Sequence, residues 1–214
     1  MIVLWLMVGT CLTIALPVVA LPFNLVGLVF NRGKARKAFG FLLALSLAFI
    51  ASIWIPSDKA DLYRHYQQVD TLSNFNFNQL GYFLGESLEP MHYFIKFIVA
   101  QTNNNCLLQF LVVLCGYFEL FWILCDYVDL KKVKASTFII AFLYVFSSVQ
   151  FINFISGLWF VFATINVALG VYCYYFRGTK YLHYIIYLLA ASLHLGALYM
   201  VIPIIILTSF RLFR

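Results

Sequence analysis

Long apolar runs alternate with short polar connectors along most of this chain. An α-helix rises about 1.5 Å per residue, so about 20 apolar residues cross a hydrocarbon layer of about 30 Å. This pattern predicts an all-α fold, a polytopic transmembrane helix bundle of about six spans that forms a single integral membrane domain over residues 1–214. The expected spans are residues 2–30, 38–55, 106–127, 136–155, 157–176 and 181–208.

The first apolar run is long enough for one tilted or broken span. Pro17 and Pro22 lie inside it and are expected to bend or end its helix. No charged side chain precedes Arg32, whereas a cleavable signal peptide has a basic start and a shorter apolar core. We therefore expect this run to be a retained membrane segment.

One long polar segment, residues 56–105, interrupts the apolar pattern. It holds five of the eight acidic residues and two of the four histidines. Asp61 and His65 are four positions apart and would share one face of a helix. The segment from Glu89 to Gln101 is expected to form a helix, because Pro90 suits a first turn and acidic side chains suit a helix N-terminus.

That expected helix is too short to cross a bilayer. We expect it to be interfacial or re-entrant. Its apolar residues fall on one face: Met91, Phe94, Ile95 and Ile98.

Composition excludes an ordinary soluble domain. Hydrophobic residues make up 64% of the chain and charged residues 10%, against roughly 25% charged in soluble domains. The net charge of +6 is interpreted as a topology signal and not as nucleic-acid binding. The five cysteines form no CxxC pair, so neither a zinc site nor a disulfide framework is indicated, and we expect no metal and no cofactor.

Basic residues give the expected orientation. Connectors 31–37, 131–134 and 177–180 carry nine of the fourteen lysines and arginines. Such connectors lie on the cytoplasmic side of membrane proteins. The N-terminus and the polar segment are then expected outside.

Polar side chains near the apolar runs are candidates for chemistry. His194 lies midway along the last run among small residues that allow a neighbouring helix to approach, and Asn153 lies near the outer junction of two spans. Both also suit hydrogen-bonded helix packing, and the cluster of Asp61, Arg64, His65 and Tyr66 also suits a solvated helix face. Ionisable groups in a membrane are costly, which favours a functional interpretation.

Four short elements carry a resemblance to a known family. They are Asp61 with Tyr66, Glu89-Pro90 at a helix start, Ser156-Gly157-Leu158-Trp159-Phe160 with Ala163, and Leu189-Ala190 with His194 and Ala197. In this order and spacing, over nearly the whole chain, they resemble the EpsG family of Wzy-type bacterial polysaccharide polymerases.

The resemblance implies a glycosyltransferase-type enzyme in the bacterial cytoplasmic (inner) membrane. It would join undecaprenyl-diphosphate-linked oligosaccharide repeats into O-antigen or exopolysaccharide, with membrane lipid and other polysaccharide assembly proteins as partners. The acceptor hydroxyl needs a base and the leaving diphosphate needs donors or cations. The expected catalytic residues are Asp61, Glu89 and His194, and the expected substrate-binding residues are Arg64, Tyr66, Lys96, Asn153 and Trp159.

The sequence departs from the family pattern in two ways, which leaves more than one function open. Trp159 stands where the family has an arginine, and members of the family are longer, so we expect a shortened or divergent member that can be inactive. Two alternatives remain open at this point: a transporter or flippase for lipid-linked sugars, and a non-catalytic membrane subunit.

Overall fold

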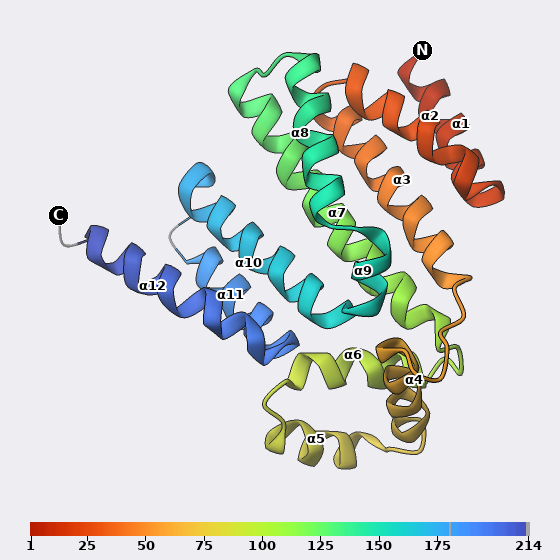
Figure 1. Ribbon diagram of the computed structural model, residues 1–214, viewed down its shortest axis with the longest axis vertical. Coiled ribbons are helices and arrows are strands. Elements are labelled where there is room, and N and C mark those ends of the chain that lie inside the picture. Colours follow the sequence, from red (N-terminus) through yellow and green to blue (C-terminus); the bar gives the residue numbers. More distant parts are fainter. Residues whose placement is uncertain (180, 213–214) are drawn as a thin grey trace. The chain divides into compact units, whose positions relative to one another are not determined.

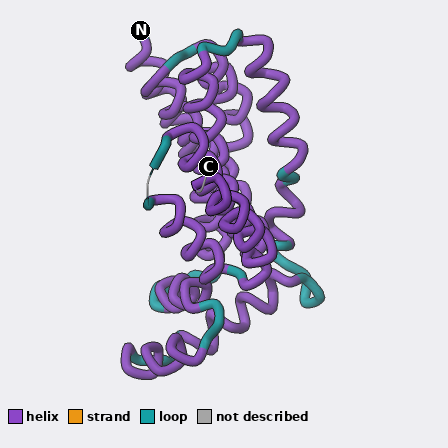
Figure 2. The backbone as a smooth tube through the Cα atoms, turned by 90° about the vertical axis from the view of Figure 1, so that its left-hand side faces the viewer, coloured by secondary structure: helices purple, strands orange, loops and turns teal. Residues whose placement is uncertain are grey.

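The computed structural model describes residues 1–179 and 181–212, with side chains described up to residue 208; Lys180, part of the third basic connector, lies outside the described residues. Every regular element in the described part is helical (Figure 1, Figure 2). The helices are α1 (Ile2–Ala15), α2 (Pro17–Phe30), α3 (Gly33–Ser52), α4 (Asp61–Leu72), α5 (Phe77–Glu86), α6 (Pro90–Ala100), α7 (Cys106–Lys131), α8 (Ala135–Ser148), α9 (Phe151–Ser156), α10 (Leu158–Arg177), α11 (Leu182–Leu193), the 3-10 turn η1 (Leu195–Ala197) and α12 (Leu198–Leu212).

Four helical segments of the described chain are long and apolar enough to cross a membrane. They are Gly33–Ser52, Cys106–Lys131, Ala135–Ser156 and Leu158–Arg177. The all-helical membrane class expected from the sequence is thus confirmed at this level, whereas six spans are not. The first and last expected spans are each divided into shorter apolar helices.

The residues cluster into two compact units, which are described separately. The first comprises Met1–Ser57 with Gln109–Ser156, and the second comprises Asp58–Leu108 with Gly157–Arg214. That the whole chain acts as one membrane domain stays a prediction.

In the first unit, residues 2–30 form a helical hairpin and not one crossing helix. The break is at Leu16, whose φ of −143° and ψ of 69° are not helical, and Pro17 starts α2. Trp5 of α1 stacks on Phe23 of α2 with ring centroids 5.1 Å apart. Each helix has 14 residues, a rise of about 21 Å, which is less than the hydrocarbon thickness.

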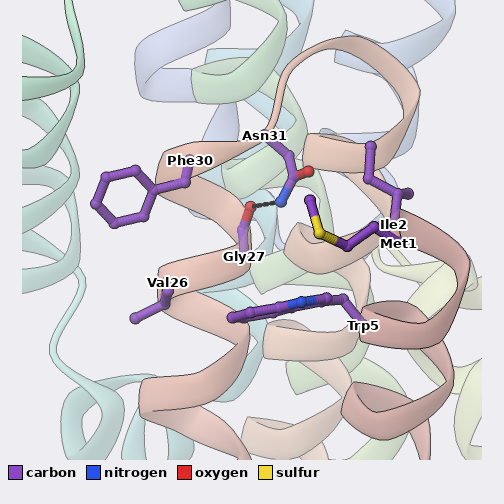
Figure 3. Close-up of a pocket in the computed structure, with 7 residues that line it drawn as sticks. All are labelled: Met1, Ile2, Trp5, Val26, Gly27, Phe30 and Asn31. Carbon is purple, nitrogen blue, oxygen red and sulfur yellow. Dashed lines mark hydrogen bonds between the residues drawn. The ribbon is translucent and has the colours of Figure 1, made fainter.

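Both ends of this hairpin lie together. Met1 and Asn31 line one pocket of about 300 Å³, with Trp5 and Phe30 on its apolar walls (Figure 3). The segment therefore returns to the side on which it begins. Pro22, expected to bend or end the helix, lies inside α2.

A buried group of hydrogen-bonded polar side chains, which we name the polar stitch, connects this hairpin to α3. The Asn24 amide of α2 donates to Thr13 Oγ1 of α1 at 2.9 Å and to Ser46 Oγ of α3 at 3.3 Å. All three side chains are fully buried. Hydrogen bonds between helices hold apolar segments together where lipid gives no hydrophobic drive.

The first basic connector meets acidic side chains of α7 at one end of the first unit. Arg36 Nη1 lies 2.6 Å from Asp129 Oδ1, and Lys37 Nζ lies 2.5 Å from Asp126 Oδ1. The Gly33 amide also donates to Asp129 at 2.9 Å. The start of α3 and the end of α7 therefore lie on the same side, as expected for connectors 31–37 and 131–134.

In the second unit, α10 and α11 pack tightly. A Cβ at Gly170 would lie 2.3 Å from the Tyr187 ring, so only a hydrogen allows this approach. After α11 the chain becomes extended at His194, with φ −155° and ψ 122°, and then reverses direction through η1 into α12 (Figure 1). The last apolar run is therefore a second broken hairpin, with His194 at its tip.

The polar segment 56–105 contains three helices. The helix expected from Glu89 onward is present as α6, and α4, α5 and α11 all pack against it. Of the apolar residues expected on one face, Phe94 is 39% and Ile98 45% exposed, while His92 and Lys96 are buried together with Phe97 and Val99. This arrangement suits a helix whose outer face meets lipid.

Candidate functional site

A partly buried group of polar side chains, most of them ionisable, lies in the second unit, where α4 and α6 face each other. From α4 come Asp61, His65 and Gln68, spaced four and three residues apart on one face. From α6 come Glu89 at the N-cap, His92 and Lys96, spaced three and four residues apart. We name these six residues the α4–α6 cluster.

The local sequence explains why α6 starts at this point. Pro90 occupies the first helical position, where the missing N–H costs nothing. Ser87 Oγ accepts the Glu89 backbone N–H at 3.1 Å. The preceding α5 begins with a capping box between Asn76 and Gln79, with both hydrogen bonds at 2.9 Å. Residue 89 is thus held at the start of a defined helix.

The first half of the cluster is a chain of hydrogen bonds. Asp61 Oδ2 lies 3.3 Å from His65 Nε2. His65 Nδ1 lies 2.9 Å from Lys96 Nζ, which also donates to Gln68 Oε1. Because a carboxylate only accepts, the proton of His65 is on Nε2, toward Asp61, and His65 Nδ1 is the acceptor for Lys96.

The second half is held by Glu89. Its Oε2 lies 3.1 Å from His92 Nδ1, and its Oε1 accepts the Leu195 backbone N–H at 2.8 Å. Leu195 is the first residue of η1, so this carboxylate ties α6 to the tip of the second hairpin. The next residue in the turn, Gly196, donates its N–H to His194 Nδ1 at 3.0 Å.

Trp159, the second residue of α10, closes the cluster. Its ring is 4.3 Å from the ring of His92 and 6.2 Å from that of His65, centroid to centroid. Lys96 Nζ lies 5.7 Å from it. Two buried nitrogens, His92 Nε2 and Trp159 Nε1, have no hydrogen-bond partner among the described residues.

Burial controls the charges in this site. Burial, reinforced by Lys96, lowers the pKa of His65 to about 4 and that of His92 to about 2. Burial lowers the pKa of Lys96 to about 7, although Asp61 and Glu89 act in the opposite direction. At neutral pH both imidazoles are therefore neutral, and the contacts to Asp61 and Glu89 are hydrogen bonds rather than ion pairs.

The structure brings together most of the site residues expected from the sequence. Asp61, Glu89, Lys96 and Trp159 lie in or against the cluster, and His194 is adjacent to the Leu195 amide that Glu89 binds. Each comes from a different one of the four sequence elements, except that Lys96 follows Glu89 on α6.

Three expected residues lie elsewhere. Arg64 pairs with Asp61, but its side chain is 72% exposed. Tyr66 interacts with Cys106, away from the cluster. Asn153 belongs to the first unit, is exposed and donates to Gln150 Oε1 at 2.9 Å. Their roles in binding stay predictions.

No catalytic or binding role is predicted from the sequence for His65, His92 or Gln68. The signal was present in the spacing, because 61, 65 and 68 and likewise 89, 92 and 96 repeat at helical intervals. The spacing does not show that the two helices pack against each other. Either set of three residues alone is equally consistent with a solvated helix face.

No group of histidine, cysteine and acidic side chains among the described residues could hold a metal ion. No protein-family model, no curated protein and no solved structure matches the chain. The function is therefore argued from the geometry of the cluster and from the four sequence elements.

Proposed function

We propose that this protein is a membrane glycan polymerase of the Wzy type, which joins undecaprenyl-diphosphate-linked oligosaccharide repeats into surface polysaccharide. The observation that supports the proposal is that four separate sequence elements come together in space. Four elements dispersed over more than 130 residues of sequence, represented by Asp61, Glu89, Trp159 and His194, meet around one buried cluster. Their resemblance to the EpsG family was stated on order and spacing alone, and spacing does not require them to meet.

The chemistry of the cluster suits the reaction. Transfer of a glycan from a diphosphate needs a group that takes the proton of the acceptor hydroxyl and donors that stabilise the leaving diphosphate. The sequence predicts Asp61, Glu89 and His194 as the residues that serve this chemistry, and Asp61 and Glu89 lie in the cluster while His194 is next to the residue that Glu89 binds. Lys96 is the cation closest to Trp159, and Arg64 is an exposed cation at the edge of the cluster.

Trp159 occupies the position of an arginine in the family pattern. Its indole offers one neutral donor and cannot replace a guanidinium at a phosphate. In the proposed site Lys96 supplies the cation instead when it is protonated, since its Nζ lies 5.7 Å from the Trp159 ring.

The two hairpins give the proposed topology. In this topology, with four crossing segments and two re-entrant hairpins, the basic connectors 31–37, 131–134 and 177–180 face the cytoplasm and the α4–α6 cluster faces outside, as the distribution of lysine and arginine indicates. The N-terminus then lies in the cytoplasm, not outside as expected for a single crossing over residues 2–30, because Met1 and Asn31 share a pocket. His194, at the tip of the second hairpin, approaches the outer segment through the Leu195–Glu89 bond.

Cysteine labelling tests this topology. In a protein without its five native cysteines, Ile2→Cys and Lys34→Cys should react with a membrane-impermeant maleimide only after the membrane is opened. Asn74→Cys, in the exposed turn between α4 and α5, should react in intact cells. Labelling of Ile2→Cys in intact cells would reject the hairpin topology.

A deletion strain of the native bacterium tests the function. Loss of the gene should shorten surface polysaccharide to single repeats, and the wild-type gene should restore length while Glu89→Ala should not. Polysaccharide of normal length in the deletion strain would refute a polymerase. Lipid-linked repeats trapped on the cytoplasmic face would instead indicate a flippase, and full rescue by both Glu89→Ala and Asp61→Ala would indicate a non-catalytic subunit.

A further inference from the structure

Lys96 is an unusual buried cation. Its side chain is fully buried, yet no carboxylate of the described residues lies within ion-pair distance of its Nζ. Its partners are two neutral acceptors, His65 Nδ1 at 2.9 Å and Gln68 Oε1. A lysine that only stabilises the fold is normally paired with an acid when buried.

The hydrogen-bond partners of Lys96 favour its neutral form. A neutral amine has two N–H groups and one lone pair, and Lys96 has two acceptors. The neutral form therefore satisfies both N–H groups and leaves its lone pair free for an incoming proton. The protonated form has a third N–H, for which only the faces of Tyr93 and Trp159, at 5.4 and 5.7 Å, are close.

The same hydrogen bonds continue outward to water. The side chains become steadily more exposed along the chain: Lys96 is fully buried, His65 is 12% exposed and Asp61 is 35% exposed. His65 joins the other two through opposite ring nitrogens, with Nδ1 toward Lys96 and Nε2 toward Asp61. An imidazole bonded in this way can accept a proton on one nitrogen and release one from the other.

We propose that Lys96 takes the proton from the acceptor sugar hydroxyl and that His65 relays it to Asp61. The inference rests on the proposed glycan transfer and assigns roles within it. In the step, the hydroxyl O–H bond breaks and the lone pair of Lys96 binds the proton. The hydroxyl oxygen forms a bond to the donor sugar carbon, and the bond from that carbon to the diphosphate oxygen breaks, so that undecaprenyl diphosphate leaves with the electron pair. Lys96 then gives a proton to His65 Nδ1 while His65 Nε2 gives its proton to Asp61 Oδ2, which releases it to water.

Glu89 does not compete for this role. Both of its carboxylate oxygens are engaged, one by the Leu195 N–H and the other by His92 Nδ1. Glu89 is therefore a positioning residue, which holds the hairpin tip and one tautomer of His92. His92 keeps a free Nε2 lone pair but is too weak a base to hold the proton, because its pKa is about 2.

The charged surroundings set the proton affinity of Lys96. The titratable groups that face Lys96 and His65 are Asp61 and Arg64 from α4, Glu89 and His92 from α6, and His194 beside His92. Burial lowers the pKa of Lys96 to about 7, and the two carboxylates keep it from falling further. A base is most effective when its pKa is near the working pH.

The first experiment needs no substrate. The full-length protein, labelled with ¹⁵N in lysine and histidine, is titrated in lipid nanodiscs. We expect neutral His65 with its proton on Nε2, and a Lys96 signal that titrates near pH 7 and moves to lower pH in Asp61→Asn. Signals are assigned with Lys96→Met and His65→Asn. A His65 proton on Nδ1, or a Lys96 that titrates near pH 10, would overturn the relay.

The second experiment separates a base from a fixed cation. Lys96→Arg keeps the charge but cannot lose its proton, so polymerisation in the deletion strain should fall by about 10²- to 10⁴-fold. His65→Asn keeps an acceptor for Lys96 but cannot relay, so it should lower the rate and flatten its pH profile. Lys59→Arg, an exposed lysine outside the cluster, is the matched control.

The outcomes are distinguishable. Lys96→Arg polymerising within threefold of wild type would show that Lys96 acts only as a cation, and would overturn the inference while the proposed function stands. Normal polymer in the deletion strain would remove the proposed function and with it the catalytic role of Lys96. The titration decides the relay in either case, including when a variant fails to accumulate in the membrane.

Discussion

Replacing Glu89 with alanine should loosen the tip of the second hairpin. The Glu89 carboxylate accepts the Leu195 N–H at 2.8 Å and the His92 Nδ1–H at 3.1 Å. The first bond joins residues 106 apart in sequence.

The magnitude follows from these two bonds. A hydrogen bond to a charged group contributes about 1.5–3 kcal/mol. The Glu89 side chain is 24% exposed, so water can replace part of what is lost. We expect the free energy of opening at the hairpin tip to fall by about 2–4 kcal/mol. Since 1.4 kcal/mol is a factor of ten, amide exchange should become about 30- to 1,000-fold faster.

Hydrogen–deuterium exchange in lipid nanodiscs measures this at Leu195. Glu86→Ala is the control, because Glu86 is an exposed acid at the end of α5 and its loss should change stability by no more than about 0.5 kcal/mol. Glu89→Gln is the graded variant: its amide oxygen can keep the Leu195 bond, but its NH₂ group meets His92 Nδ1–H. Leu195 exchange in Glu89→Ala within threefold of Glu86→Ala would refute the reasoning.

Three further predictions concern packing, charge and the polar stitch. Gly170→Ala should lower stability by about 1–3 kcal/mol, because its Cβ would lie 2.3 Å from the Tyr187 ring. The control Gly81→Ala meets nothing within 4 Å and should be neutral or stabilising, and denaturant unfolding in detergent measures both variants. The unfolded chain binds the Lys96 proton more tightly, because the pKa of Lys96 is about 7 when folded and 10.5 ordinarily, so the contribution of Lys96 to stability should grow from pH 7 to 10.5. Unfolding midpoints across this range should rise relative to those of Lys96→Met, and an equal pH dependence in the two proteins would contradict the prediction. Asn24→Ala should cost about 1–2 kcal/mol through its two buried hydrogen bonds, measured by the same unfolding assay, and a change below 0.3 kcal/mol would show that the stitch is dispensable.

The helices were largely predictable and their breaks were not. The length of each apolar run predicts helices of the membrane class, and Pro90 predicts the start of α6. Pro17 indicates a break, but a proline in a helical run is equally consistent with a kink, as Pro22 inside α2 shows. His194 carries no breaking signal, since histidine is tolerated in helices, and yet α11 ends at it.

The candidate site was predicted in its members more than in its arrangement. Residue type and the four sequence elements identified Asp61, Glu89, Lys96 and His194 as candidates. The relay through His65 could not be foreseen, because its two bonds join α4 to α6 and depend on which faces of the two helices meet. Burial in α6 does not follow polarity alone, since Lys96 is buried while Phe94 is exposed.

The sequence by itself determined that the chain is helical and belongs in a membrane, since too few charged residues are present to cover a surface in water. It also determined where the polar chemistry is concentrated, because local composition needs no knowledge of distant contacts. Only the tertiary structure decided that residues 2–30 turn back on themselves and that Glu89 reaches Leu195. Contacts across 106 residues depend on how whole helices pack, and a one-dimensional pattern does not encode which faces meet.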